Sequence, residues 1–401
     1  MKENIDPCVK CSICNLYCPV ALETDLFPGA KTSGPDAQRF KFSNGVIPEE
    51  FSRYCIGCGN CVINCPAGIN TPLLNILSKA KYREKHPLSL GERLLENVIF
   101  LPSYIDIFSN LINKITNSSF VKKIIFPFLG LSSKRELPYF AKRSFSHLIK
   151  AKKLKKGGKK VVYFYGCYTE AHEPEVGEAV VYVLNKNGYD PVFPSWVCCG
   201  APFIGAGNIE KGEKLAKKNI KSLSKMDSLD IIFSSTTCYH TIRDSYKELY
   251  EIDGIDDVAK RCKDIFQFLV ELNDNGKLNK DFGKIKKRYF YHTPCHLKLL
   301  GIGTPALEIL KLIPSIEIIK GDALCCGLGG LFGYKDYGYD ISVKIGEELA
   351  KEIEDSNVDG VISDCEGCRI QVHHLTKKPV YHPITILMEA YKLGDHLSKE
   401  V

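Results

Sequence analysis

The sequence predicts an α+β protein in three parts: a helical N-terminal domain, a connecting segment, and two duplicated α/β lobes. Two cysteine runs of identical spacing occupy the first 66 residues. Further on, the chain repeats its own motifs at a distance of about 127 residues, too long for a solenoid repeat and typical of a duplicated domain. In each copy, short apolar runs alternate with helical patterns, which indicates α/β structure. The predicted domains are residues 1–85, 86–158, 159–285 and 286–401.

Both N-terminal runs follow the pattern C-x2-C-x2-C-x3-C-P. This pattern holds [4Fe–4S] clusters in two-cluster ferredoxins, where the fourth cysteine of each run ligates the other cluster. We therefore expect crossed ligation. One predicted set is Cys8, Cys11, Cys14 and Cys65, and the other is Cys55, Cys58, Cys61 and Cys18. A zinc site is the weaker alternative, because zinc sites use pairs of C-x2-C rather than triples followed by C-P.

Composition supports metal binding rather than a disulfide framework. The chain has 401 residues, 44% of them hydrophobic, and 18 cysteines. It opens MKENIDPC, without the apolar segment of a secretory signal, so we expect a reducing, cytoplasmic environment. It contains no run of 18 apolar residues, so we expect no membrane-spanning helix.

Each lobe repeats three motifs that carry cysteines. Residues 160–170 correspond to 287–298, residues 197–207 to 324–334, and residues 230–240 to 359–368. The metal-binding cysteines predicted for the first lobe are Cys167, Cys198, Cys199 and Cys238. Those predicted for the second lobe are Cys295, Cys325, Cys326, Cys365 and Cys368.

The two lobes differ in their number of cysteines. A cubane needs four thiolates, so five in the second lobe indicate an additional iron–sulfur cluster of non-cubane shape. Four in the first lobe suit either an ordinary cluster or tetrahedral zinc. Two alignments of Cys238 stay open: its distance from the Cys-Cys pair favours Cys365 as its counterpart, whereas the flanking residues favour Cys368.

The connecting segment is amphipathic and then basic. Apolar residues fall at helical spacing, namely Leu101, Ile105, Phe108, Leu111, Ile112 and Ile115. Residues 134–160 hold eleven Lys or Arg and one acid, Glu136. The segment is either a helical pair packed on the protein or a surface that lies in an anionic membrane interface. The basic run alone would also fit a solvated linker.

One further stretch predicts a loop, and the glycine-rich stretches exclude one class of cofactor site. Residues 28–40, PGAKTSGPDAQRF, predict a loop by composition. The glycines of residues 205–207 and 327–333 do not follow the pattern G-x-G-x-x-G after a strand, so no dinucleotide site is predicted. A chain without a nicotinamide or flavin site must receive its electrons from a partner. No catalytic residue is assigned.

Taken together, these motifs resemble those of the CCG-domain iron–sulfur proteins. That family includes the B and D subunits of heterodisulfide reductase, the iron–sulfur subunit of glycolate oxidase, and the C subunit of anaerobic glycerol-3-phosphate dehydrogenases. The blocks PGAKTSGPDAQRF, RYCIGCGNCVINCP, SSTTCYHTIRD, YHTPCH, DCEGC and HPITIL are most similar to the last of these. The resemblance covers nearly the whole chain.

The resemblance implies an electron-transfer subunit, peripheral on the inner face of the cell membrane. Its partners would be a flavoprotein dehydrogenase and a quinone or the membrane surface, with no nucleic acid. The alternative is a thiol–disulfide oxidoreductase similar to heterodisulfide reductase, which would use the unusual cluster of the second lobe. The five-cysteine lobe fits both hypotheses, and the basic, amphipathic segment favours the first.

Overall fold

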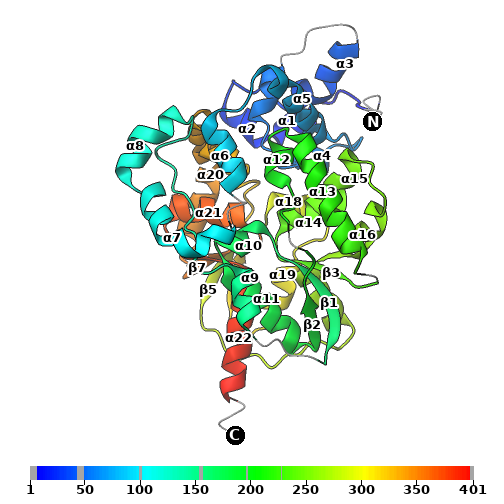
Figure 1. Cartoon of the computed structure of the whole chain (residues 1–401), viewed down its shortest axis with the longest axis vertical. Helices are drawn as coiled ribbons and strands as arrows, with labels where there is room; N and C mark the ends of the chain where they lie inside the picture. Colours follow the sequence, from blue (N-terminus) through cyan, green and yellow to red (C-terminus); the bar gives the residue numbers. More distant parts are fainter. Residues whose placement is uncertain are drawn as a thin grey trace.

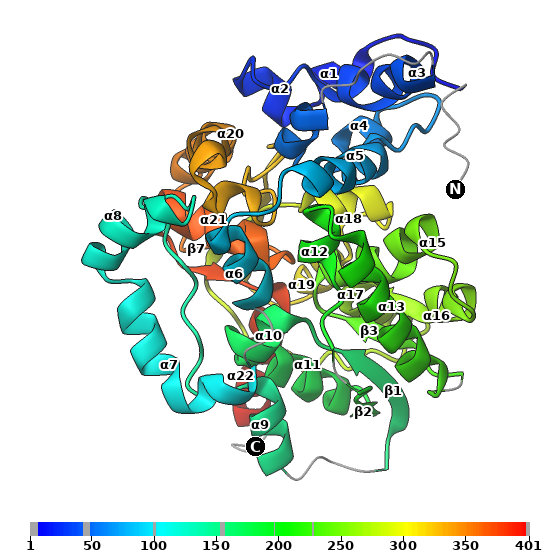
Figure 2. The same ribbon diagram turned by 45° about the horizontal axis from the view of Figure 1, so that its top comes forward.

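The computed structural model describes residues 7–42, 49–98, 102–152, 157–195, 197–226 and 228–397. Leu101 and residues 153–156 of the connecting segment lie outside this part of the chain. Helices α1–α5 form one end of the molecule and the two lobes lie beneath them (Figures 1 and 2).

The N-terminal domain consists of short helices around the two cysteine runs. They are α1 (Ile13–Leu16), α2 (Pro19–Glu23), the π-helix η1 (Thr32–Asp36), α3 (Ala37–Phe42), the 3-10 helix η2 (Glu49–Tyr54), α4 (Asn60–Ile63) and α5 (Thr71–Lys85). Helix α5 begins where the side chain of Asn70 accepts a hydrogen bond from the Leu73 amide at 3.1 Å. Pro72 lies in its first turn, where no amide donor is needed.

The loop predicted for residues 28–40 is wrong, because helix covers most of this stretch. Residues 30–42 are helical, and Pro35 is accommodated in the π-helical turn η1. Tertiary contacts hold this turn: a side chain at Gly34 would meet Thr71 at 2.7 Å, and Ser33 accepts a hydrogen bond from Asn75. Packing against α5 therefore overrides the turn-forming composition.

The connecting segment forms helices at the side of the molecule. They are α6 (Leu90–Val98), α7 (Pro102–Thr116), α8 (Ser119–Phe128) and α9 (Phe145–Ala151). Figure 1 shows α7 and α8 on the side away from α13 and α16. Parts of this segment pack on the protein, since Phe126 is buried and Ile112 packs against Phe140 and Ala171.

Each lobe contains a parallel four-stranded sheet. The first lobe comprises β1 (Lys159–Phe164), α10 (Cys167–Ala171), α11 (Pro174–Lys186), β2 (Tyr189–Val192), α12 (Ala201–Gly205), α13 (Ile209–Ser224), β3 (Ile231–Phe233), α14 (Thr236–His240), η3 (Thr241–Ser245), α15 (Tyr246–Leu249), α16 (Ile255–Arg261), β4 (Cys262–Asp264) and α17 (Ile265–Asp274). The second comprises β5 (Arg288–Tyr291), α18 (Cys295–Leu300), α19 (Pro305–Leu310), β6 (Glu317–Lys320), η4 (Phe332–Tyr334), α20 (Asp336–Asp355), β7 (Gly360–Ile362), α21 (Glu366–Thr376), β8 (Val380–Tyr381) and α22 (Pro383–Leu397). The strand orders are β2-β1-β3-β4 and β6-β5-β7-β8, so the topology is duplicated and the predicted fold class is confirmed.

This topology places cysteines at one edge of each sheet. Cys167 and Cys295 follow the central strands β1 and β5, and Cys238 and Cys365 follow their neighbours β3 and β7. Because all strands are parallel, their carboxyl ends meet at one edge, where ligand sites of open α/β sheets form. No helix among the described residues is long and apolar enough to span a bilayer.

The two lobes share one hydrophobic core. It combines first-lobe residues such as Tyr163 and Phe266 with second-lobe residues such as Tyr289 and Leu387. An ion pair also joins the lobes, because the guanidinium of Arg369 binds the carboxylate of Glu173, with 3.1 Å between Nε and Oε2. The side chain of Arg369 is 5% exposed and that of Glu173 is 21% exposed.

Glu173→Ala should destabilise the joined lobes by on the order of 3 kcal/mol, because it leaves the Arg369 charge buried and unpaired. The measurement is the melting temperature of the anaerobically purified full chain. Lys134→Ala is the matched control, since its partner Asp340 and Lys134 itself are exposed and such pairs contribute little. Equal melting of both variants would contradict a structural role for the buried pair.

Candidate metal centres

The first group of N-terminal thiols combines both cysteine runs. Cys14 lies with Cys8 and Cys11 of its own run and with Cys65 of the other. Burial raises the pKa of the Cys14 thiol, and the charges of these three neighbours raise it further. The structure thus brings together the four residues of the first predicted set.

The second group contains the other four cysteines of the two runs, namely Cys55, Cys58 and Cys61 with Cys18. Burial raises the pKa of Cys18 to about 11, and the charge of Cys55 adds to the effect. Burial likewise raises the pKa of Cys61, and the charges of Cys55 and Cys18 raise it further. Cys58 is fully enclosed, and its neighbours include Cys61 and Cys18.

Cys58 also connects the N-terminal domain to the second lobe. Burial raises its pKa, and the charge of Cys325 adds to this effect. The two side chains belong to one hydrophobic cluster with Cys18, against which Cys55 and Cys295 pack. The second ferredoxin-type set and the second-lobe set are therefore adjacent.

The five predicted cysteines of the second lobe form a continuous group. Cys325 has Cys295 and Cys326 as its thiol neighbours, and Cys368 has Cys326 and Cys365.

The four cysteines of the first lobe form a similar but smaller group. Cys198 contacts Cys167 and Cys199, and Cys199 contacts Cys238. The remaining cysteine, Cys262, is buried in β4 and donates to the carbonyl of Val258 at 3.2 Å, so it stands apart from all four groups.

The thiol groups fit iron–sulfur clusters. All 18 cysteines lie in the described part of the chain, and none is in a disulfide. Backbone amides point at sulfur atoms: Gly200 donates to Cys198 at 3.3 Å and Gly327 donates to Cys325 at 3.4 Å. Hydrogen bonds from backbone amides to sulfur are typical of thiolates that bind clusters, and they tune the reduction potential of the cluster. Gly327 has φ +89°, and a side chain there would meet the Ser342 carbonyl at 2.3 Å, so only glycine fits.

The strand register indicates which second-lobe cysteine corresponds to Cys238. Tyr163 pairs with Ile232 and forms a hydrogen bond with Ser234, as Tyr291 pairs with Ile362 and donates a hydrogen bond to Asp364. Superposing these pairs aligns Cys238 with Cys368. It also aligns Ser235 with Cys365.

A serine thus replaces the fifth cysteine in the first lobe. Ser235 donates a hydrogen bond to Glu366 of the second lobe at 3.0 Å, so Glu366 is held between the lobes. Burial raises the pKa of this carboxyl. Glu366 therefore lies at the start of α21 and faces the first lobe rather than a turn in solvent.

Arg135 is a functional candidate that sequence analysis did not identify, because it is one of many cations in the basic run. Its side chain is fully buried and donates to the Gly333 carbonyl, Gln371 and Ser342. No ion pair with a carboxylate within 4 Å is found for it among the described residues. Cys326 is among the negative charges that act on it. Buried cations need a counter-charge, which an anionic metal–thiolate group at Cys326 would provide.

A cavity of about 960 Å³ lies where the N-terminal domain and both lobes meet. Cysteines of the second N-terminal set and of both lobes line it, together with His296 and Glu366. The rest of the lining is mainly apolar and includes Ile56, Leu73, Leu95, Ile112, Phe140 and Leu328. The thiols of both lobes therefore face a common apolar space.

Fold and thiol geometry together define a class of protein: iron–sulfur proteins with a two-cluster ferredoxin domain and two cysteine-rich lobes. Family models agree with this class. A 4Fe-4S dicluster domain matches residues 4–69, and a cysteine-rich domain, CCG, matches residues 161–243 and 289–373.

Individual relatives match along most of the chain. The C subunit of anaerobic glycerol-3-phosphate dehydrogenase of Escherichia coli (strain K12) is 30% identical, over 96% of this chain and 98% of that protein. The B subunit of fumarate reductase (CoM/CoB) of Methanothermobacter marburgensis is 26% identical, over 92% and 68%. The D subunit of dihydromethanophenazine:CoB–CoM heterodisulfide reductase of Methanosarcina barkeri is 25% identical, over 91% and 87%. The chain belongs to the family of the C subunit of anaerobic glycerol-3-phosphate dehydrogenase, as its motifs predicted, and is an iron–sulfur subunit of an oxidoreductase.

Crossed ligation predicts that cysteines from different runs affect the same cluster. In the full chain, Cys65→Ser should perturb the same EPR signal as Cys11→Ser, and Cys18→Ser the same signal as Cys55→Ser. Each substitution should lower iron content by up to about four atoms, the content of one cluster. If Cys65→Ser instead perturbs the signal that Cys55→Ser perturbs, each run holds its own cluster.

Proposed function

We propose that the chain passes electrons from a flavoprotein dehydrogenase of the glycerol-3-phosphate type to a membrane quinone. The observation that carries this proposal is the unbroken order of three cysteine sets, from the N-terminal domain to the second lobe. Iron–sulfur clusters bound at these sets would supply one-electron transfer. Two [4Fe–4S] clusters belong to the N-terminal sets, and a further cluster of non-cubane shape belongs to the second lobe.

Side-chain neighbours define the order of the sets. Cys14 of the first set is among the charges that act on Cys61 of the second. Cys58 of the second set is next to Cys325 of the second lobe. The first-lobe set is not part of this electron-transfer order. It faces the cavity through Cys167 and holds an ordinary cluster or zinc.

The surface around the first set suits an electron-donating partner. Cys11 is exposed, and the apolar side chains of Val9 and Leu16, in the same cysteine run, are 66% and 69% exposed. Exposed apolar side chains around a redox site are typical of a protein interface. The partner that the family name indicates, a dehydrogenase, would bind here.

The opposite end of the order suits a lipophilic acceptor. The cavity brings the second-lobe cysteines together with apolar side chains, as sites for apolar ligands do. Ile112 lines it from helix α7, while Phe108 and Leu111 of the same helix are 50% and 55% exposed on the outside. A quinone bound in the cavity next to α7 would be close both to the second-lobe thiols and to a membrane that contacts the outer side of α7.

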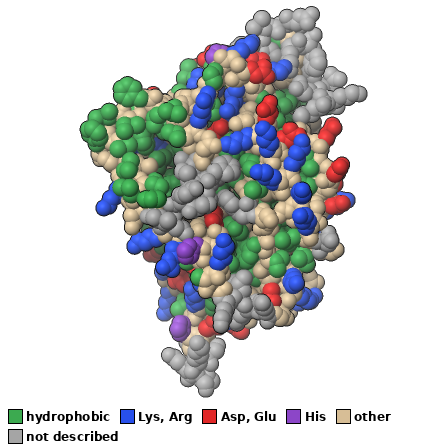
Figure 3. Space-filling view, viewed as in Figure 1, with side chains coloured by type: hydrophobic (Ala, Val, Ile, Leu, Met, Phe, Trp, Pro, Cys, Tyr) green, Lys and Arg blue, Asp and Glu red, His purple; other side chains and the backbone are tan. Residues whose placement is uncertain are grey.

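Helices α6–α8 carry an exposed apolar surface that suits a bilayer interface. The exposed apolar side chains are Leu90, Leu94, Phe108, Leu111, Ile115, Phe120, Ile124, Ile125 and Phe128. Figure 3 shows this apolar patch over α7 and α8 at the upper left. Apolar insertion with nearby lysines is the usual mode of peripheral binding, here at the inner face of the cell membrane.

Vesicle flotation tests the membrane surface. Phe120→Glu combined with Phe128→Glu should reduce flotation of the full chain on anionic vesicles by about tenfold or more, because two exposed anchors (68% and 88%) become charged. Salt should weaken the binding of the unmodified chain without abolishing it. Leu312→Glu, at an exposed apolar residue outside these helices, is the control. Equal flotation of all three would assign the patch to a protein partner.

Quinone reduction tests the order of the sets. Cys326→Ser should abolish electron delivery from the partner dehydrogenase to a quinone analogue, while the N-terminal clusters stay reducible. Cys199→Ser should mainly lower stability, because the first-lobe set lies outside the proposed order. Metal content and EPR of both variants complete the experiment. Loss of quinone reduction with Cys199→Ser alone would reverse the assignment of the lobes.

A thiol–disulfide oxidoreductase remains the second candidate. It is favoured by the five thiols that face a cavity large enough for a small disulfide. A relative with 25% identity is named as part of a heterodisulfide reductase. Reduction of a disulfide but not of a quinone by the electron-loaded chain would establish this candidate instead.

A further inference from the structure

His292 is a buried histidine whose ring has no hydrogen-bond partner. The residue is 1% exposed, and neither Nδ1 nor Nε2 has a partner within the described part of the chain. Buried polar groups in folded proteins almost always have a partner, so a buried ring with two unpartnered nitrogens needs an explanation.

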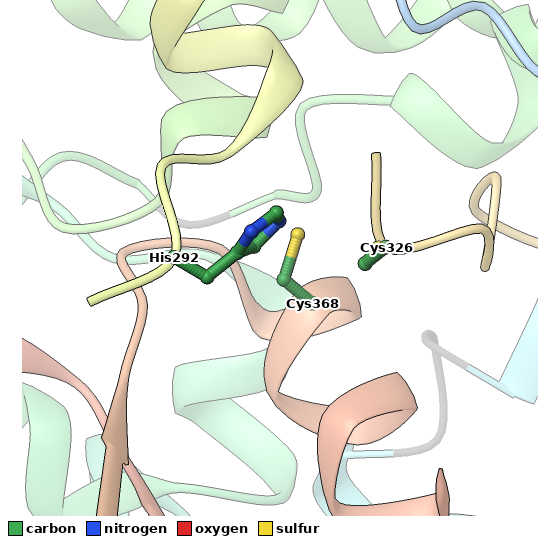
Figure 4. A group of neighbouring side chains, drawn as sticks. All are labelled: His292, Cys326 and Cys368. Atoms are coloured by element: carbon green, nitrogen blue, oxygen red, sulfur yellow. The ribbon is translucent and has the colours of Figure 1, made fainter. Parts of the chain in front are cut away.

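The ring faces two of the second-lobe cysteines. A ring nitrogen of His292 and the Sγ atoms of Cys326 and Cys368 all lie within 4.8 Å of one another. In Figure 4, His292 follows β5 and points toward Cys368 in the first turn of α21, with Cys326 on the neighbouring loop. Three donor atoms from three segments therefore surround one point.

A second buried histidine in the same lobe is fully satisfied by the protein. Nε2 of His382 lies 2.8 Å from the Ser234 carbonyl, and Nδ1 accepts from the Ile384 amide at 3.1 Å. The lobe thus bonds both nitrogens of one buried ring and neither nitrogen of the other. The missing partners of His292 are specific to its position beside the cysteines.

The first lobe provides an internal comparison. Tyr163 and Tyr291 occupy equivalent strand positions, so the residues after them, Phe164 and His292, correspond. The lobe with four cysteines has an apolar ring here, and the lobe with five has an imidazole. This difference accompanies the replacement of Cys365 by Ser235.

We propose that His292 binds iron in the second-lobe centre through one ring nitrogen, as a donor in addition to the five cysteines. Imidazole is a known ligand of iron in some iron–sulfur centres, and the identity of the ligands sets their reduction potential. The inference requires an iron–sulfur centre in this lobe but not the identity of the donor or acceptor, so it goes beyond the proposed function.

Nitrogen couplings detected by pulsed EPR test the proposal. The full chain, purified anaerobically with its clusters and with ¹⁵N-labelled histidine, should show a strong nitrogen coupling on the second-lobe signal. The coupling should change between ¹⁴N- and ¹⁵N-histidine samples. His292→Phe, which installs the first-lobe residue, should remove it and shift the reduction potential of this centre alone.

His382→Gln is the control, because it replaces a buried histidine that the protein already satisfies; it should retain the coupling. A second-lobe signal without nitrogen coupling in the unmodified chain would overturn the inference without any variant having to fold. A coupling that survives His292→Phe would do the same, and both results would leave the proposed function standing. A second lobe without iron would overturn both.

Discussion

The close approach of buried thiols is the constraint on which the rest of the structure depends. Every cysteine except Cys262 lies in one of four groups, and within them burial and neighbouring charge act on the same thiols. Such groups are unfavourable unless a metal cation compensates the charge of the thiolates. The parallel sheets bring the thiols to their carboxyl edges, and glycines at the Cys-Cys pairs let amides reach sulfur.

The duplicated lobes have diverged around this constraint. The second lobe has the fifth cysteine and His292, receives the buried side chain of Arg135 from the connecting segment, and lies next to Cys58 of the N-terminal domain. The first lobe has serine and phenylalanine at the corresponding positions, Ser235 and Phe164, and its thiols reach the shared cavity through Cys167. Duplication therefore supplies a scaffold for one specialised centre, with Glu366 and the Arg369–Glu173 pair joining the two halves.

The sequence predicted those features that depend on local spacing. The C-x2-C-x2-C-x3-C-P runs and the repeated Cys-Cys-Gly motifs identified the fold class and the family, and both are confirmed. The domain boundaries and the ligand sets remain predictions, although the structure groups the thiols in the same sets. Both interpretations of the connecting segment describe part of it, since one side of α7 packs on the protein and another is exposed.

The features that the sequence did not predict arise from tertiary packing. A basic run gave no sign that Arg135 turns inward, and a turn-rich composition gave no sign that η1 packs on α5. The correspondence of Cys238 with Cys368 depends on strand register, which the unequal loops of the two lobes obscured. The cavity forms only where the three parts of the chain meet.

The central claim is that a redox-active centre in the second lobe directly contacts one N-terminal cluster. EPR of the fully reduced chain, compared with that of partly reduced samples, tests this claim most directly. Because Cys58 and Cys325 are neighbours, the account predicts a third iron–sulfur signal that is magnetically coupled to one of the two N-terminal signals. Two signals only, with stoichiometric zinc in the second lobe, would contradict it.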